Sequence, residues 1–183
     1  MQTHTLDVPK PDAEANVAAI RRFFDEVVNE GRLDVADELF AADFDLHAPL
    51  DGRESGPAGV KQFVAALRAG FRDLTLEIDE VLVSGDKVVV RWHTVRQTHT
   101  GPYRGIPPTG RRVRMSAIEI FRLDDGRIAE AWLELDALGG VRDMGVVPPD
   151  ELSSGRRALF VIGSLFRFAK LEAQHALRSR RPA

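Results

Sequence analysis

Cysteine is absent from this chain of 183 residues. Its absence excludes disulfide bonds, thiol nucleophiles and thiolate metal ligands. Long apolar runs are also missing, so we expect no segment to cross a membrane, and residues 1–10 lack the apolar core of a signal peptide. The sequence therefore predicts a cytoplasmic protein without disulfides.

Histidine is scarce, and the three central histidines are His47, His93 and His99. None of them is spaced as a pair of metal ligands on one helix, so we expect no metal site. The hydrophobic fraction of 44% and the charged fraction of 29% are typical of a soluble globular protein. The length fits one domain with a real core.

The charge is unevenly distributed along the chain. Its net value is −3, but residues 151–183 hold seven Lys or Arg and two Glu, a net charge of +5. Residues 1–150 therefore carry a net charge of −8. A segment this acidic argues against a nucleic-acid partner.

Hydrophobic periodicity predicts three helices followed by strands. A helix with an apolar stripe from Val17 to Val28 follows Asp12 as its N-cap, and a shorter helix begins at Asp34 and contains Phe40. A third helix follows Ser55 and Pro57. The expected strands cover 44–47, 74–84, 87–98, 111–123 and 127–136. This order predicts an α+β fold, in which the helices pack on the concave face of a four-strand antiparallel meander and leave a pocket at its open end.

The segment from His99 to Asp136 is the most informative stretch of the chain. It begins with an ordered, non-helical loop, whose glycines and prolines lie at 101, 102, 105, 107, 108 and 110. Asp125-Gly126 then has the composition of a tight hairpin turn between two strands. We expect this segment to place several polar side chains at one end of the sheet.

The last strand alternates between two faces. Period-2 alternation assigns one face to Ile128, Glu130, Trp132, Glu134 and Asp136. The other face carries small or aliphatic residues, while Glu119 on the preceding strand, Glu130 and Glu134 are expected to be exposed. Three acids therefore share a face with a large aromatic ring.

At these residues the chain resembles the SnoaL-like polyketide cyclase family, within the nuclear transport factor 2-like superfamily. The resemblance rests on His-x-Gly at His99, the loop Gly-x-Pro-Pro-Thr-Gly-Arg that ends at Arg111, Phe121-Arg122 before the Asp-Gly turn, and Trp132 followed by Asp136. It extends from about Asp12 to about Val147. It implies a cone-shaped α+β barrel, while the superfamily hosts several different reactions and non-enzymatic domains.

The resemblance implies that Asp136 is the general acid/base. A carboxylate at an apolar pocket wall can have its pKa raised towards the working pH, as proton transfer requires. The alternative is a helix cap or a structural ion pair. The related cyclases carry a histidine on the preceding strand, where this chain has Ile120 and Arg122.

Three further side chains are candidate catalytic helpers. His99 could polarise a carbonyl group or relay a proton, or it could only fix the loop. His47 follows a short strand at a position that these domains often give to histidine. Arg122 could hold an enolate or a carboxylate, or it could be a surface residue in a salt bridge.

Several apolar, aromatic and polar side chains are candidates to line a substrate pocket, although aromatic residues in a domain of this size often belong to the core. The candidates are Trp92, Trp132, Phe40, Phe63, Met115, Tyr103, Ile120 and Glu134. A ketosteroid-type isomerase would need a tyrosine on the first helix, and Tyr103, the only tyrosine, lies in the loop.

The C-terminal segment from Arg156 to Arg180 has apolar residues at helical spacing with basic residues among them. Such a helix can pack on its own domain or a sister subunit, dock a partner protein, or lie on an anionic membrane surface. We expect a flexible segment over residues 1–11, the α+β domain over 12–147 and this basic extension over 148–183. A homodimer is also expected, because a second copy commonly buries the exposed face of such a sheet.

Three functions are compatible with these features. The first is a cofactor-independent, SnoaL-like cyclase acting on a small apolar or aromatic, polyketide-type substrate. The second is a related dehydratase, epoxide-opening or pyran-forming enzyme, and the third is a non-catalytic ligand-binding or dimerisation module.

Overall fold

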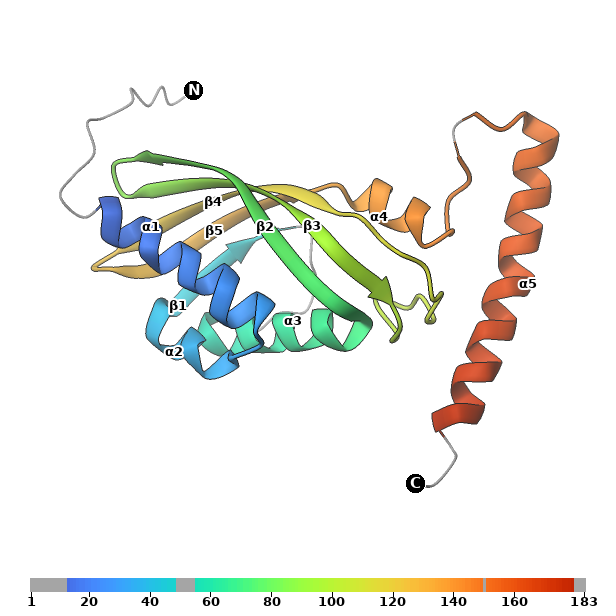
Figure 1. Ribbon diagram of the computed structural model, residues 1–183, viewed down its shortest axis with the longest axis horizontal. Helices are drawn as coiled ribbons and strands as arrows, with labels where there is room; N and C mark the ends of the chain where they lie inside the picture. The colour runs from blue at the N-terminus through green and yellow to red at the C-terminus, as the bar shows by residue number, and fades with distance from the viewer. Residues whose placement is uncertain (1–12, 49–54, 150, 180–183) are drawn as a thin grey trace. The chain divides into compact units, whose positions relative to one another are not determined.

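The computed structural model describes residues 13–48, 55–149 and 151–179, and it has the predicted α+β class (Figure 1). The expected N-cap at Asp12, the segment 1–11 that was expected to be flexible and the expected helix end at Arg180 lie outside these ranges. The helical segments are α1 (Ala13–Arg22), a π-helix (Phe23–Asn29), a 3-10 turn (Leu33–Val35), α2 (Ala36–Leu39), α3 (Gly56–Gly70), α4 (Ala137–Asp143) and α5 (Ser154–Ser179). The strands are β1 (Phe40–His47), β2 (Phe71–Ser84), β3 (Lys87–His99), β4 (Ser116–Asp124) and β5 (Arg127–Leu135).

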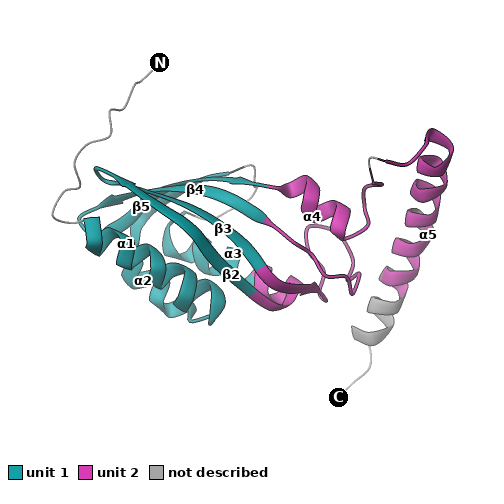
Figure 2. Ribbon diagram, turned by 45° about the horizontal axis from the view of Figure 1, so that its top comes forward, with its two compact units in different colours: residues 1–65, 75–94, 116–135 teal, residues 66–74, 95–115, 136–183 magenta. Residues whose placement is uncertain are grey.

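The chain divides into two compact units, which Figure 2 colours separately. The first unit comprises residues 1–65, 75–94 and 116–135, and the second comprises 66–74, 95–115 and 136–183. The predicted domain boundaries after residues 11 and 147 stay a prediction. Each unit is described separately below.

The sheet has the strand order β1-β5-β4-β3-β2. The meander from β2 to β5 confirms the predicted order of strands, although β4 begins at Ser116 and not at Arg111. The sheet was expected to be antiparallel, but it is mixed. β1 pairs with β5 in parallel, with Phe40 opposite Ile128 and His47 opposite Trp132. In the described part of the chain the sheet is not closed into a barrel, because β1 and β2 are its edges.

Strand β1 begins earlier than predicted. Phe40 is its first residue rather than part of the second helix, which ends at Leu39. The pairing of β1 with β5 shifts register between Phe40 and Asp45, and this irregularity interrupts the alternation by which a strand is recognised. Only the part from Phe44 to His47 was therefore predicted.

A bulge in β5 changes which residues share a face. Arg122 pairs with Glu130 and Leu123 pairs with Ile128, so Ala129 is an extra residue on β5. Ile128 is consequently buried, together with the face that carries Ala131 and Leu133. Its predicted place on the face of Glu130 is wrong, whereas Trp132 and Glu134 keep theirs.

The core of the first unit is an aromatic cluster on one face of the sheet. Phe24 packs edge-on against Trp92 of β3 and Phe121 of β4, with ring centroids 6.2 and 6.3 Å apart. Phe23 packs against Phe40 at 5.1 Å. The π-helix helps to bury these neighbouring rings, because its wider turn places consecutive residues towards the core. Figure 1 shows α1 and α2 on this side of the sheet.

In the second unit the loop after β3 closes the C-terminal end of α3. The backbone amides of Thr100 and Gly101 both donate to the carbonyl oxygen of Gly70, at 2.9 and 3.0 Å. They satisfy an acceptor that the end of a helix leaves without a partner. A Cβ atom on Gly101 would overlap the carbonyl oxygen of Ala69, so this close approach requires glycine.

Candidate functional site

A buried carboxyl group lies in the core of the first unit. Glu119 is in the middle of β4, between Val90 on β3 and Leu133 on β5. Its side chain is 7% exposed, and the indole Nε1 of Trp92 donates a hydrogen bond to its Oε2 at 3.1 Å. This hydrogen bond orients the carboxyl group through one of its two oxygen atoms.

Burial raises the pKa of Glu119 to about 7, because the charged form loses its hydration. The hydrogen bond from Trp92 acts in the opposite direction and lowers this pKa. Both protonation states are therefore populated near neutral pH, as a general acid/base requires. Buried groups with strongly perturbed pKa values are candidates for functional residues.

The expected exposure of Glu119 is wrong. Ala117, Phe121 and Leu123 of the same strand are all buried, and Glu119 lies among them at the same period-2 positions. That alternation was a signal in the sequence that could have placed Glu119 on the inner face. The prediction followed the usual exposure of glutamate instead.

Asp136 begins α4 as its N-cap residue. Its side chain accepts a hydrogen bond from the backbone amide of Gly139 at 2.8 Å, and the residue is exposed. This is the cap that the sequence left open as an alternative. A role for Asp136 in proton transfer stays a prediction.

His99 and Gln97 lie at the end of β3 and are both buried, at 0% and 1% exposure. The Nδ1 atom of His99 is 3.1 Å from Oγ1 of Thr109 in the following loop. Burial lowers the pKa of His99, which favours the neutral imidazole. In the described part of the chain, His99 Nε2 and both polar atoms of the Gln97 amide have no hydrogen-bond partner.

Replacing Gln97 with Leu should leave the free energy of unfolding unchanged or raise it by up to about 2 kcal/mol. The reason is that a buried polar group without a partner costs free energy, and an apolar side chain of similar size avoids that cost. Chemical denaturation of the two proteins measures the difference. A loss of stability in the variant would mean that the amide is satisfied, for instance by a buried water molecule.

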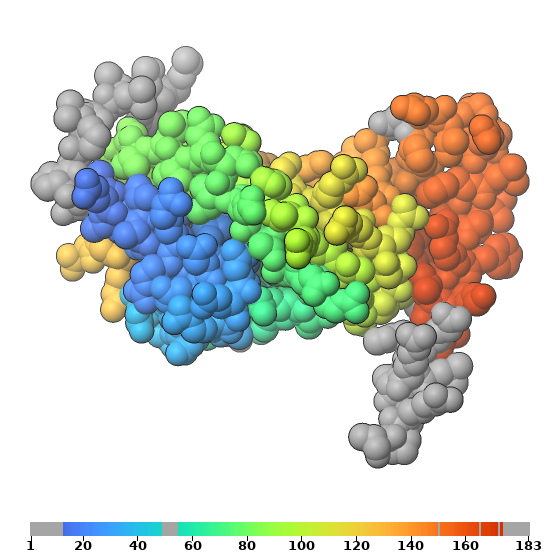
Figure 3. Space-filling view, in the orientation of Figure 1, coloured from blue at the N-terminus to red at the C-terminus, as the bar shows by residue number. Residues whose placement is uncertain are grey.

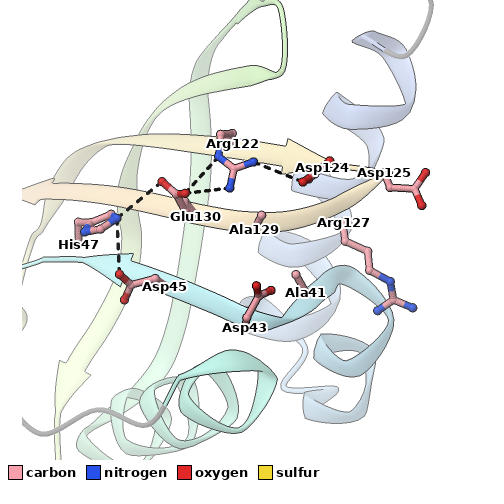
Figure 4. Close-up of a pocket in the computed structure, with 10 residues that line it drawn as sticks. All are labelled: Ala41, Asp43, Asp45, His47, Arg122, Asp124, Asp125, Arg127, Ala129 and Glu130. Carbon is pink, nitrogen blue, oxygen red and sulfur yellow. Dashed lines mark hydrogen bonds and ion pairs between the residues drawn. The ribbon is translucent and has the colours of Figure 1, made fainter.

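A polar groove runs along β1, β4 and β5, on the face of the sheet opposite the aromatic core (Figure 4). His47 stacks on Trp132 with ring centroids 5.0 Å apart, and its Nε2 lies 3.7 Å from both Asp45 and Glu130. Arg122 donates to Glu130 at 2.8 Å. The structure thus brings His47 and Arg122 together through a shared carboxylate.

Arg122 and Glu130 form an ion pair in this groove. The hydrogen bond from Arg122 holds the pKa of Glu130 below its usual value, and the same bond raises the pKa of Arg122. Arg122 is also 3.8 Å from Asp124. These contacts are the surface salt bridge expected as the alternative role of Arg122. A role of Arg122 in catalysis stays a prediction.

The candidate lining residues do not form one cluster. Trp92 is opposite Ala117 and Trp132 is opposite Ile120, so the two indoles lie on opposite faces of the sheet. Phe40 belongs to the buried core, and Glu134 is exposed. Trp92 is the candidate that donates a hydrogen bond to the buried carboxyl group.

The remaining lining candidates lie elsewhere. Phe63 is a half-buried residue of α3, and Met115 lies against Gly140 in the second unit. Tyr103 packs on Phe71 with ring centroids 4.9 Å apart. Roles of these residues in substrate binding stay predictions.

Among the residues that the structure describes, no group of three or more histidine or acidic side chains is arranged to hold a metal ion. The described helices also include none that is long and apolar enough to span a membrane.

Comparison with known proteins gives consistent matches over most of the chain. The family model for the SnoaL-like polyketide cyclases matches residues 18–144. The nogalonic acid methyl ester cyclase of Streptomyces nogalater is 31% identical over 125 residues, which cover 67% of this chain and 92% of that protein.

Solved structures show the same relationship. TsrD from Streptomyces laurentii is 30% identical with a TM-score of 0.69, and the match covers 75% of this chain and all of TsrD. IdmH from Streptomyces antibioticus is 31% identical with a TM-score of 0.58, over 72% of this chain and 99% of IdmH.

Proposed function

Because this chain belongs to the SnoaL-like polyketide cyclase family, we propose that it cyclises a small polyketide-type substrate by acid/base catalysis without a cofactor. The observation that carries this proposal is the buried Glu119 carboxyl group, which Trp92 orients and which titrates near neutral pH. We assign the proton transfer to Glu119. Asp136, which the family resemblance favours, is the second candidate.

The proposed reaction needs one group that takes and returns a proton. The Glu119 carboxylate removes a proton from a carbon next to a carbonyl group, and the conjugated substrate delocalises the resulting charge. The carbanion then forms a carbon–carbon bond to a second carbonyl carbon, whose oxygen takes the proton back from Glu119. No electron leaves the substrate, so the step balances without an oxidant or a reductant.

The apolar surroundings of Glu119 support this chemistry in two ways. Val90 and Leu133 flank the carboxyl group on the neighbouring strands, and they help to keep its charged form poorly hydrated. Aromatic side chains of the same core, including Phe24 against Trp92, also keep water away from the carboxyl group.

A related dehydratase, epoxide-opening or pyran-forming reaction would use the same carboxyl group. A non-catalytic ligand-binding module is the alternative from another class. The homodimer and the cytoplasmic location stay predictions.

Incubation with nogalonic acid methyl ester, the compound in the name of the related cyclase, tests the proposed function. We expect a product of the same mass as the substrate, separated by chromatography, in the presence of a metal chelator and without added cofactor. Binding of the ester without any product, measured by calorimetry, would contradict the cyclase and favour the binding module.

A further inference from the structure

Helix α5 lies beyond the region matched by the family model and spans Ser154–Ser179 (Figure 1). One side of it contacts its own unit. Ser164 is 5% exposed, and its hydroxyl group donates to the carbonyl oxygen of Gly145 at 3.5 Å. Arg167 donates to the same hydroxyl group at 3.1 Å and lies over the ring of Phe160. Through these contacts, this side of the helix packs against the rest of the second unit.

A different side of α5 carries large apolar residues that face solvent. Leu159 is 70% exposed, Ile162 is 52% exposed and Phe166 is 74% exposed. Their spacing of three and four residues places them in one stripe along the helix. The exposed residues Ala169 and Ala173 continue this stripe at the same spacing. Packing among the described residues of the second unit therefore does not explain the apolar stripe.

Basic residues flank the apolar stripe. Arg156 precedes Leu159 by three positions and Lys170 follows Phe166 by four, so each lies beside a member of the stripe, and both are exposed. In the space-filling view the orange-to-red part of α5 is visible at the surface (Figure 3). Apolar residues beside basic ones are typical of helices that lie in the interface of an anionic membrane.

The charge of the rest of the chain favours the same partner. Residues 151–183 carry a net charge of +5, whereas residues 1–150 carry −8. An anionic lipid surface attracts the first segment and repels the second, so contact would be confined to the C-terminal segment. An acidic protein surface would satisfy the basic residues but offers no comparable apolar layer for Phe166.

We propose that α5 binds the surface of an anionic membrane, with Leu159, Ile162 and Phe166 inserted among the lipid chains and Arg156 and Lys170 at the headgroups. The helix lies in the interface and does not cross the bilayer, which agrees with the absence of a membrane-spanning helix in the described chain. This proposal goes beyond the cyclase activity and does not depend on it.

Co-sedimentation of the full chain with lipid vesicles tests the proposal. We expect binding to vesicles that contain phosphatidylglycerol and much weaker binding to vesicles of phosphatidylcholine alone. Phe166→Glu should weaken the binding at least about tenfold, because it removes a large inserted side chain. Lys170→Gln should weaken it about fivefold, as expected for one basic residue at an anionic surface, and added salt should weaken it further.

Leu82→Glu is the matched control, since Leu82 is 58% exposed on β2 and outside α5. It should bind vesicles as the unchanged protein does, and circular dichroism should show that all variants are folded. The proposal is overturned if the unchanged chain does not sediment with the anionic vesicles, or if Phe166→Glu binds equally well. It is also overturned if Phe166→Glu dissociates a dimer seen by size-exclusion chromatography, because the stripe then belongs to a second copy.

Discussion

Replacing Glu119 with Gln is expected to lower the turnover number by about a hundredfold to ten-thousandfold, the usual contribution of a general acid/base. The amide keeps the shape of the carboxyl group and still accepts the hydrogen bond from Trp92, so the fold should remain intact. Steady-state kinetics with nogalonic acid methyl ester measures the effect. Glu77→Gln, on the exposed surface of β2, is the matched control and should retain full activity.

The pH profile gives this prediction a second readout. If Glu119 acts as the base, activity of the unchanged protein should rise as the pH passes through about 7, where its carboxyl group ionises. The Gln variant should lose this dependence. An unchanged rate and profile in the variant would remove Glu119 from the mechanism.

Stability reports on the same group without any substrate. The pKa of Glu119 is raised in the folded state, so the folded protein binds more protons than the unfolded one between about pH 4.5 and 7. Its contribution to the free energy of unfolding is fully present below pH 4.5 and is lost as the pH rises through 7. The loss is on the order of 3 kcal/mol. Glu119→Gln should remove this part of the pH dependence.

Asp136→Asn separates the two candidates for the acid/base role. Asparagine caps a helix about as well as aspartate, so stability should hardly change. If Glu119 moves the proton, activity should persist in this variant. Loss of activity with unchanged stability would transfer the catalytic role to Asp136.

Replacing Gly101 with Ala should lower the free energy of unfolding by about 3 kcal/mol or more. The added methyl group would overlap the carbonyl oxygen of Ala69, and neither backbone segment can move away without breaking the hydrogen bonds to Gly70. Overpacking of this kind costs about 1–3 kcal/mol, and the lost hydrogen bonds add to it. Urea denaturation monitored by tryptophan fluorescence measures the change.

Gly163→Ala is the matched control for this substitution. Gly163 lies within α5, where an added Cβ meets no atom within 4 Å. Alanine there should be neutral or stabilising by about 1 kcal/mol, since glycine is a poor helix former. Equal stability of the Gly101→Ala variant and the unchanged protein would mean that the loop and the end of α3 are not in close contact in solution.

Local patterns in the sequence predicted the local parts of the fold. The Asp125-Gly126 turn forms with φ angles of 47° and 73°, which is the left-handed conformation that this pair of residues tolerates. The long C-terminal helix also follows from its periodicity and begins at Ser154. Both elements form from interactions between residues that are close in the sequence, so the local sequence is sufficient to predict them.

Features that depend on distant partners were not predictable in the same way. The parallel pairing of Phe40 with Ile128 has no signature within either strand. The extra residue Ala129 changes which side chains of β5 share a face, and this bulge is defined only by the register between β5 and β4. Glu119 differs from these cases. Its inward position was implied by alternation, but its significance depends on the Trp92 side chain of another strand.

The parallel pairing of β1 with β5 also has a consequence for how the chain folds during synthesis. The ribosome completes β1 at His47, but its partner strand begins only at Arg127. Until then β1 remains an unpaired strand edge, while β2, β3 and β4 can form their hairpins with neighbours already made. Closing the loop between β1 and β5 lowers the conformational entropy of the chain before the hydrogen bonds between these strands have formed. We therefore expect the β1–β5 ladder to form after the hairpins among β2 to β5.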